Sequence, residues 1–110
     1  MPLYQRKPIY LTAMDYNNII NSSKVVMVEF FATWCPHCQR MMPVVEQLKE
    51  LLDGRADIYQ FDIDKNQEAA DSLNVESLPT FIVYRDGKEV WRQSGEMDGQ
   101  VLLSKIESFL

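Results

Sequence analysis

The stretch "KVVMVEFFA" over residues 24–32 is apolar almost throughout, and it constrains the fold more than any other part of the chain. This pattern is typical of a strand that is covered on both faces, as in the middle of a parallel sheet. Apolar residues then recur at helical spacing over residues 36–52, and Asp53-Gly54 closes that segment. Pro43 should kink this helix rather than begin a new one. A buried strand that leads directly into a long helix indicates an α/β fold.

The rest of the chain continues this alternation of strand and helix patterns. We expect further strands at 8–12, 56–64, 80–84 and 88–94, and further helices at 14–23, 66–74 and 98–110. Asp86-Gly87 should join the last two strands as a hairpin turn. The order β-α-β-α-β-α-β-β-α predicts a largely parallel sheet with helices on both faces and an antiparallel edge from the final hairpin.

The length and composition of the chain narrow the class of protein. Its 110 residues fit a single domain over 1–110, and 46% hydrophobic residues are enough for a core that needs no disulfide. The 16 acidic residues exceed the 11 basic ones, which argues against a nucleic-acid partner. No membrane-spanning run and no signal peptide are visible. We therefore expect a cytoplasmic monomer, or a secreted or periplasmic protein if a leader has been removed.

The chemistry of the chain is concentrated in its only two cysteines, Cys35 and Cys38, which flank Pro36 and His37. Residues i and i+3 of a helix share one side, within reach of a disulfide. At the start of the helix, free N–H groups and the helix dipole should stabilise a Cys35 thiolate, so we expect an exposed nucleophile there. Cys38 continues the apolar stripe of the helix and should be the less exposed, resolving thiol.

Three neighbours are candidates for tuning this pair. A protonated His37 would stabilise the thiolate further, and Pro36 suits the first turn of a helix. Glu29 interrupts the apolar run, where a carboxylate is costly to bury. A buried Glu29 with a raised pKa could accept the proton of Cys38. The alternatives are a solvated surface position for His37, and a solvent-facing Glu29 if its strand lies at the edge of the sheet.

Other roles for a CxxC pair are weaker but remain open. A structural zinc needs four ligands, and the chain offers two cysteines and one histidine, so we expect no metal. An iron–sulfur cluster bridged between two chains is a further alternative. A static disulfide is another, although the small ring that Cys35 and Cys38 would close adds little stability. Trp34 could be a packing residue or part of a binding rim. Met41, Met42 and Trp91 are expected to fill the core.

Four stretches carry a resemblance to a known family over residues 8–110: "VEFFATWCPHCQRMMP", "FDID", "SLPTFIVYRDGKEV" and "SGEMDGQVLLSKI". In order and spacing they resemble thioredoxin. The resemblance implies a thioredoxin fold, with a central mixed sheet flanked by helices on both faces. It implies an enzyme that reduces disulfide-containing protein substrates and is recharged by a thioredoxin reductase. Cys35 would be the nucleophile and Cys38 the resolving thiol, with no cofactor besides this pair.

The resemblance also implies roles for residues outside the cysteine motif. Glu29 stands where thioredoxins usually have a buried aspartate that accepts a proton. Pro79 matches the family's cis-proline, which faces the active disulfide. Trp34, Leu78 and Gly95 match the groove that holds substrate, where the backbone of Leu78 would pair with an extended peptide.

The chain departs from the thioredoxin pattern in three places, one of which is the longer Glu29 in place of the usual buried aspartate. The dipeptide Pro36-His37 replaces the usual Gly-Pro and resembles the periplasmic disulfide oxidases, whose large helical insertion this chain is too short to contain. Gln60 replaces a lysine that usually neighbours the buried acid, so the pKa of that acid should be tuned differently. The alternatives are a disulfide oxidase or isomerase, and a non-catalytic module that grips a peptide at Leu78–Pro79.

Overall fold

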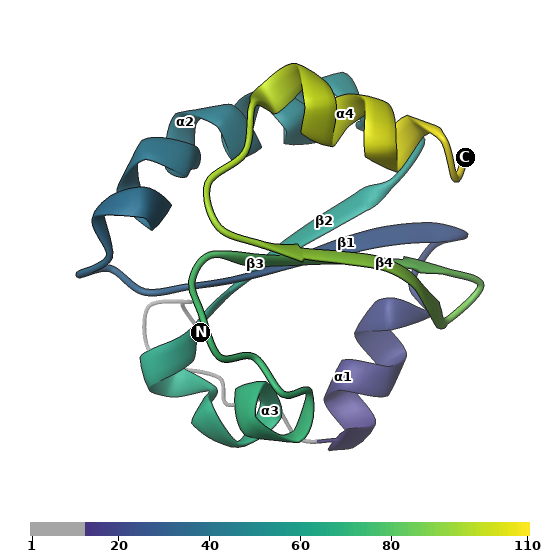
Figure 1. Ribbon diagram of the computed structural model, residues 1–110. Coiled ribbons are helices and arrows are strands. Elements are labelled where there is room, and N and C mark those ends of the chain that lie inside the picture. The colour runs from purple at the N-terminus through teal and green to yellow at the C-terminus, as the bar shows by residue number, and fades with distance from the viewer. Residues whose placement is uncertain (1–12) are drawn as a thin grey trace, which may run out of the picture.

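The structure is a computed structural model that describes residues 13–110, and within them four strands form one sheet between two layers of helices (Figure 1). The strands are β1 (Val25–Phe31), β2 (Asp57–Asp62), β3 (Thr80–Arg85) and β4 (Lys88–Ser94). The helices are α1 (Ala13–Ile20), α2 (Pro36–Leu51), α3 (Gln67–Ser72) and α4 (Gly99–Glu107), with a short 3-10 helix η2 at Ile63–Lys65. The strand predicted at 8–12 lies outside the described residues.

The strand order is β2-β1-β3-β4, and the sheet is mixed. β1 and β2 are parallel, whereas β3 runs antiparallel to both β1 and β4. The prediction of a largely parallel sheet is therefore wrong, while the mixed sheet that the thioredoxin resemblance implied is confirmed. The reason lies between β2 and β3, because α3 has six residues and is only about 9 Å long. So short a helix does not bring the chain back to the opposite end of the sheet. β3 therefore starts at the end where β2 stops and runs in the opposite direction.

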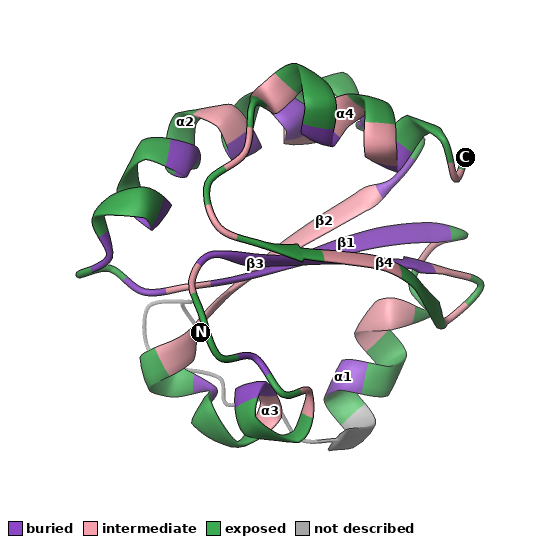
Figure 2. Ribbon diagram, in the orientation of Figure 1, coloured by how far each residue is buried: buried purple, intermediate pink, exposed green. Residues whose placement is uncertain are grey.

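The apolar run of β1 is buried on both faces, as predicted (Figure 2). Val25 and Met27 pack into the core under α2 and α4. Val26 and Val28 point to the opposite face, where they pack against residues of α1 and α3. Figure 1 shows α2 and α4 together on one side of the sheet and α1 and α3 on the other. Helices on both faces are thus confirmed.

Local signals also placed the hairpin and the ends of the helices. Asp86 and Gly87 both have positive φ, 52° and 78°, as the two central positions of this hairpin turn require. α4 begins after Asp98, whose carboxylate accepts hydrogen bonds from the N–H groups of Gln100 and Val101. α2 continues through Pro43, so this proline does not begin a new helix.

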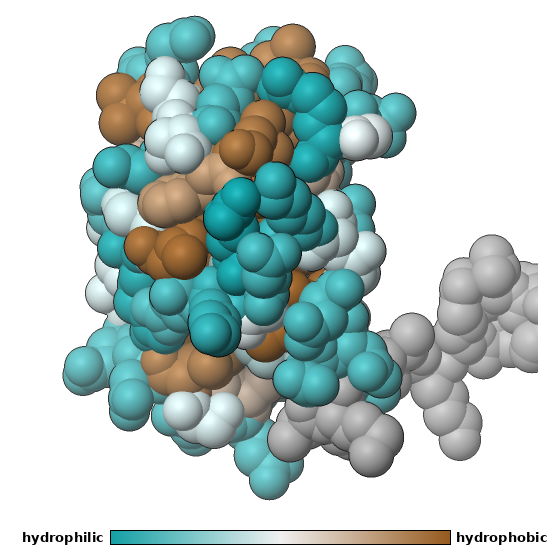
Figure 3. Space-filling model, turned by 90° about the vertical axis from the view of Figure 1, so that its right-hand side faces the viewer, coloured by the Kyte–Doolittle hydropathy of each residue, from teal (hydrophilic) through white to brown (hydrophobic). Residues whose placement is uncertain are grey.

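The buried stripe of α2 consists of Cys38, Met41, Val45 and Leu48. Met42 was expected in the core, but it is 40% exposed, because each residue turns about 100° around the helix and Met42 leaves the buried side. On the face shown in Figure 3, apolar side chains form separate patches among polar ones. No helix within residues 13–110 is long and apolar enough to cross a membrane.

Candidate active site

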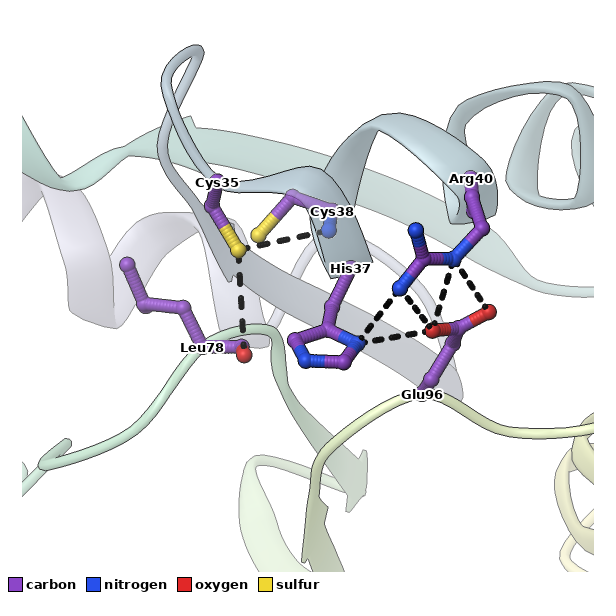
Figure 4. A network of polar contacts seen from close by, with 6 residues as sticks. All are labelled: Cys35, His37, Cys38, Arg40, Leu78 and Glu96. Carbon is purple, nitrogen blue, oxygen red and sulfur yellow. Dashed lines mark hydrogen bonds and ion pairs between the residues drawn. The ribbon is translucent and has the colours of Figure 1, made fainter.

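Cys35 lies in the connection between the buried strand β1 and the long helix α2. β1 ends at Phe31, and Cys35 is the N-cap residue of α2, with extended backbone at φ −91° and ψ 115°. Its Sγ accepts a hydrogen bond from the backbone N–H of Cys38 at 3.3 Å (Figure 4). Both thiols are free. The predicted position of Cys35 at a helix start, with an N–H directed at its sulfur, is confirmed.

The predicted exposure of Cys35 is wrong, because both cysteines are buried. Cys35 is 5% exposed and Cys38 is 1% exposed. Ile63 and Leu78 pack around the two cysteines and cover Cys35. The two sulfurs differ in position rather than in exposure. Cys35 Sγ faces the backbone oxygen of Leu78 at 3.9 Å, whereas Cys38 belongs to the buried stripe of α2.

The Cys38 thiol is held in its protonated form. Burial, followed by the hydrogen bond with Cys35 and the charges of Cys35 and Glu29, raises its pKa to about 12. Backbone contact with Ala32 acts in the opposite direction. Cys38 therefore needs a proton acceptor before its sulfur can attack.

Glu29 is completely buried in β1, and the alternative of a solvent-facing side chain is wrong. β1 is a central strand, and Glu29 is paired with Gln60 on one side and with Phe81 on the other. Burial raises the pKa of Glu29 to about 7, while the hydrogen bond from Gln60 and the charge of Lys49 limit the rise. Gln60 Nε2 donates to Oε1 at 2.9 Å, and Oε2 has no hydrogen-bond partner within residues 13–110. The predicted burial and raised pKa are confirmed.

The residues matched to a substrate groove converge beside Cys35. The Leu78–Pro79 peptide bond is cis. The Gly95 N–H donates to the Pro79 carbonyl oxygen at 2.7 Å, and Gly95 has a φ of +97°, which glycine adopts without strain. Trp34 is 64% exposed, and its Nε1–H donates to Asp64 Oδ2 at 2.9 Å. Trp34 is thus held at the surface and is not packed in the core.

His37 is exposed and belongs to a charged network that the sequence did not indicate (Figure 4). Its Nδ1 lies 2.8 Å from Glu96 Oε1, and Arg40 Nε donates to both carboxylate oxygens of Glu96 at 3.0 and 3.1 Å. Arg40 and then His37 lower the pKa of Glu96 to about 2. Glu96 is 59 positions from His37, and the only signal that could have led to it is its place directly after Gly95.

A cavity of about 150 Å³ lies beside Cys38, and Met42 is part of its lining. The Sδ of Met42 is also in contact with Gln60 Nε2, at 3.8 Å, and Gln60 is the donor to Glu29. A cavity of this size can hold water. Within residues 13–110, no three His, Cys, Asp or Glu side chains are grouped so as to hold a metal ion.

A mixed sheet flanked by helices, a free CxxC pair at the start of α2 and a cis bond between Leu78 and Pro79 beside Cys35 define a thioredoxin-fold protein. The family model for thioredoxin matches residues 7–108. The thioredoxin of Chlorobaculum thiosulfatiphilum is 33% identical over 104 residues, which cover 92% of this chain and 96% of that protein. The chain therefore belongs to the thioredoxin family.

Two further relatives support this assignment. A mutant thioredoxin from Halobacterium salinarum has a structure that matches with a TM-score of 0.82 and 34% identity, over 94% of this chain and 90% of that one. Chloroplastic thioredoxin Y1 of Arabidopsis thaliana is 35% identical over 92 residues, or 84% of this chain and 54% of that protein. The chain thus spans about half the length of the first chloroplastic relatives that it matches.

Proposed function

We propose that this protein reduces disulfide bonds in partner proteins through the Cys35–Cys38 pair. One observation carries the proposal: Cys35 caps α2 with its sulfur on the N–H of Cys38, next to the backbone of Leu78. A thiolate at this position is stabilised by the start of the helix. It also lies where an extended peptide would pair with the strand-like edge at Leu78.

In the first step, the Cys35 thiolate attacks one sulfur of the substrate disulfide. The substrate S–S bond breaks, one substrate sulfur leaves as a thiolate and takes up a proton, and a mixed disulfide forms between Cys35 and the other. Because Cys35 is only 5% exposed, the substrate disulfide would have to approach it beside Leu78, whose carbonyl oxygen lies 3.9 Å from Cys35 Sγ. Trp34 and Gly95 would form the walls of the groove that receives it.

In the second step, Cys38 loses its proton and attacks Cys35 Sγ in the mixed disulfide. The second substrate sulfur leaves and is protonated, the Cys35–Cys38 disulfide forms, and two electrons have passed from the pair to the substrate. A thiol whose pKa is raised to about 12 needs a base for this step. Glu29, whose pKa is raised to about 7, is the buried group suited to accept that proton near neutral pH.

An electrostatic effect between the two groups supports this transfer, because the charge of Glu29 contributes to the raised pKa of Cys38. The cavity beside Cys38 is large enough to hold a water molecule that could take part. Gln60 donates to Oε1 of Glu29, so Oε2, which has no hydrogen-bond partner within residues 13–110, is the oxygen that would receive the proton.

The oxidised pair has to be reduced again, and we propose a flavoprotein thioredoxin reductase as the donor, acting on a monomer in the cytoplasm. Family membership supports the reductase. A reducing compartment suits a CxxC pair that works as a catalytic dithiol. Cell fractionation and reduction by purified thioredoxin reductase with NADPH test these two points, and association with a membrane fraction or no reduction would contradict them.

The Pro36-His37 dipeptide favours a second candidate, a disulfide oxidase. A glutathione redox titration of the Cys35–Cys38 pair separates the two functions. We expect a reduction potential near that of thioredoxin, about −270 mV, together with catalysed reduction of a disulfide-bonded protein such as insulin. A potential close to about −120 mV would show the oxidase instead. Intact thiols without exchange activity would show a peptide-binding module.

A further inference from the structure

One nitrogen of His37 contacts two neighbours, one of which requires a hydrogen on it and the other a lone pair. Nδ1 lies 2.8 Å from Glu96 Oε1 and 2.9 Å from Arg40 Nη2. The carboxylate of Glu96 only accepts hydrogen bonds, since its pKa is lowered to about 2, and the guanidinium of Arg40 only donates them. A ring nitrogen carries either a hydrogen or a lone pair, so it satisfies one of these neighbours at a time.

The geometry favours Glu96 over Arg40 as the partner of this nitrogen. Arg40 already donates from Nε to both oxygens of Glu96, and its Nη2 lies 3.0 Å from Oε1, so Arg40 is held by the carboxylate without any bond to His37. Figure 4 shows His37 Nδ1 in contact with both Arg40 and Glu96, and the contact with Glu96 Oε1 is the shorter by 0.1 Å. An N–H on Nδ1 completes a set of donors around one carboxylate, whereas a lone pair there would face Oε1 at 2.8 Å.

We propose that Glu96 is a positioning residue for the redox centre: it selects the Nδ1–H form of His37 and holds the ring against the start of α2, in competition with Arg40. Glu96 belongs to the segment between β4 and α4, directly after Gly95, and His37 and Arg40 belong to α2. The carboxylate therefore links the start of α2 to the segment that follows β4.

The contact with Glu96 determines the orientation of the exposed His37 ring. The His37 side chain is 60% exposed, so without Glu96 the ring is free to turn into solvent. Held by Glu96, the ring lies between Leu78 and the Arg40–Glu96 pair, as Figure 4 shows. Part of its influence on the Cys35 thiolate then depends on a residue far along the chain. This last step rests on the proposed function of the cysteine pair.

The first test is independent of redox activity. Nitrogen-15 NMR of the full chain, at a pH where the ring is neutral, shows which nitrogen of the single histidine carries the proton. We expect mainly Nδ1–H in the natural protein and in Arg40→Met, and a change to mainly Nε2–H in Glu96→Ala, where Arg40 is the remaining partner. Glu107→Ala, which removes an equally exposed carboxylate paired with Arg55, is the control and should change nothing. The same tautomer in all four proteins would overturn the proposal.

The second test asks whether the link reaches the cysteines. It uses an Arg40→Met background, so that removing Glu96 does not release a guanidinium charge near Cys35. There, Glu96→Ala should shift the equilibrium constant with glutathione toward the more reducing side by roughly twofold to fivefold, the scale of an exposed charge interaction. With His37→Gln added, this shift should disappear. A shift that persists without His37 would overturn the link. A tautomer change in a protein without exchange activity would instead contradict the proposed function.

Discussion

The pKa values of two glutamates near the cysteine pair are shifted in opposite directions by their surroundings. Glu29 is completely buried in the central strand, receives one hydrogen bond from the neutral amide of Gln60, and has a pKa raised to about 7. Glu96 is exposed, is in contact with Arg40 and His37, and has a pKa lowered to about 2. The same side chain is thus a group that can gain or lose a proton at neutral pH in one place and a permanent charge in the other.

The difference shows what each environment is suited to do. Burial, only partly offset by the hydrogen bond from Gln60 and the charge of Lys49, disfavours the charged carboxylate, which makes Glu29 fit to accept a proton from Cys38. Two donors at the surface favour the charged form, which makes Glu96 fit to hold His37 and unfit to transfer protons. The CxxC pair therefore has a proton acceptor on its buried side and a fixed anion on its exposed side.

The largest expected effect comes from the sulfurs themselves. Cys35→Ser should abolish disulfide reduction, because no nucleophile remains. Cys38→Ser should instead accumulate the mixed disulfide with substrate, which non-reducing electrophoresis and mass spectrometry detect. Loss of activity in both variants without a trapped complex would contradict the assigned roles.

Glu29→Gln should slow release of the mixed disulfide by at least about tenfold near neutral pH, because general-base catalysis typically contributes more than that. Formation of the mixed disulfide should be unaffected. Stopped-flow fluorescence with a disulfide substrate separates the two steps. Glu46→Gln, on the exposed side of α2, is the matched control. Equal rates of release in both variants would remove Glu29 from proton transfer.

The buried acid should also make stability depend on pH. The pKa of Glu29 is about 7 in the folded protein against an ordinary value of 4.5, so the folded state binds the proton more tightly. Stability should therefore fall as pH rises from 4.5 through 7, by up to about 3 kcal/mol from this group. Urea unfolding across this range should show the decline, and Glu29→Gln should flatten it. A decline that Glu29→Gln leaves unchanged would mean that other groups cause it.

A smaller change is expected when the partner of Glu29 is altered. In the natural protein, the hydrogen bond from Gln60 to Oε1 lowers the pKa of Glu29, and Gln60→Leu removes this bond. We expect the pH-dependent decline in stability to move to higher pH, and stability above that range to fall by about 1–2 kcal/mol, since the charged acceptor loses its donor. An unmoved pH profile would show that burial alone sets the pKa of Glu29.

The smallest effect on stability belongs to the exposed carboxylate. Glu96→Ala should leave the free energy of unfolding at neutral pH unchanged within error, because exposed ion pairs contribute little. Urea unfolding of this variant beside Glu107→Ala checks it. A clear loss in Glu96→Ala alone would mean that Glu96 supports the fold and does more than position His37.

The sequence by itself determined the features that depend on local pattern. An apolar run predicted a strand buried on both faces, and the structure places Val25 to Phe30 there. The spacing of the cysteines after that strand placed Cys35 at a helix start, and Asp86-Gly87 marked the hairpin. Even the burial of Glu29 followed from its apolar neighbours. In each case, neighbours in the chain are also the neighbours that set the conformation or the burial.

Tertiary structure alone decided what depends on residues far apart in the chain. The antiparallel course of β3 follows from a short connection through α3, and the burial of Cys35 follows from Leu78, 43 positions away. The network of Glu96 with His37 and Arg40 exists because the segment after β4 folds over the start of α2. Composition and periodicity carry no trace of such contacts, because each charged residue by itself is compatible with an ordinary solvated surface.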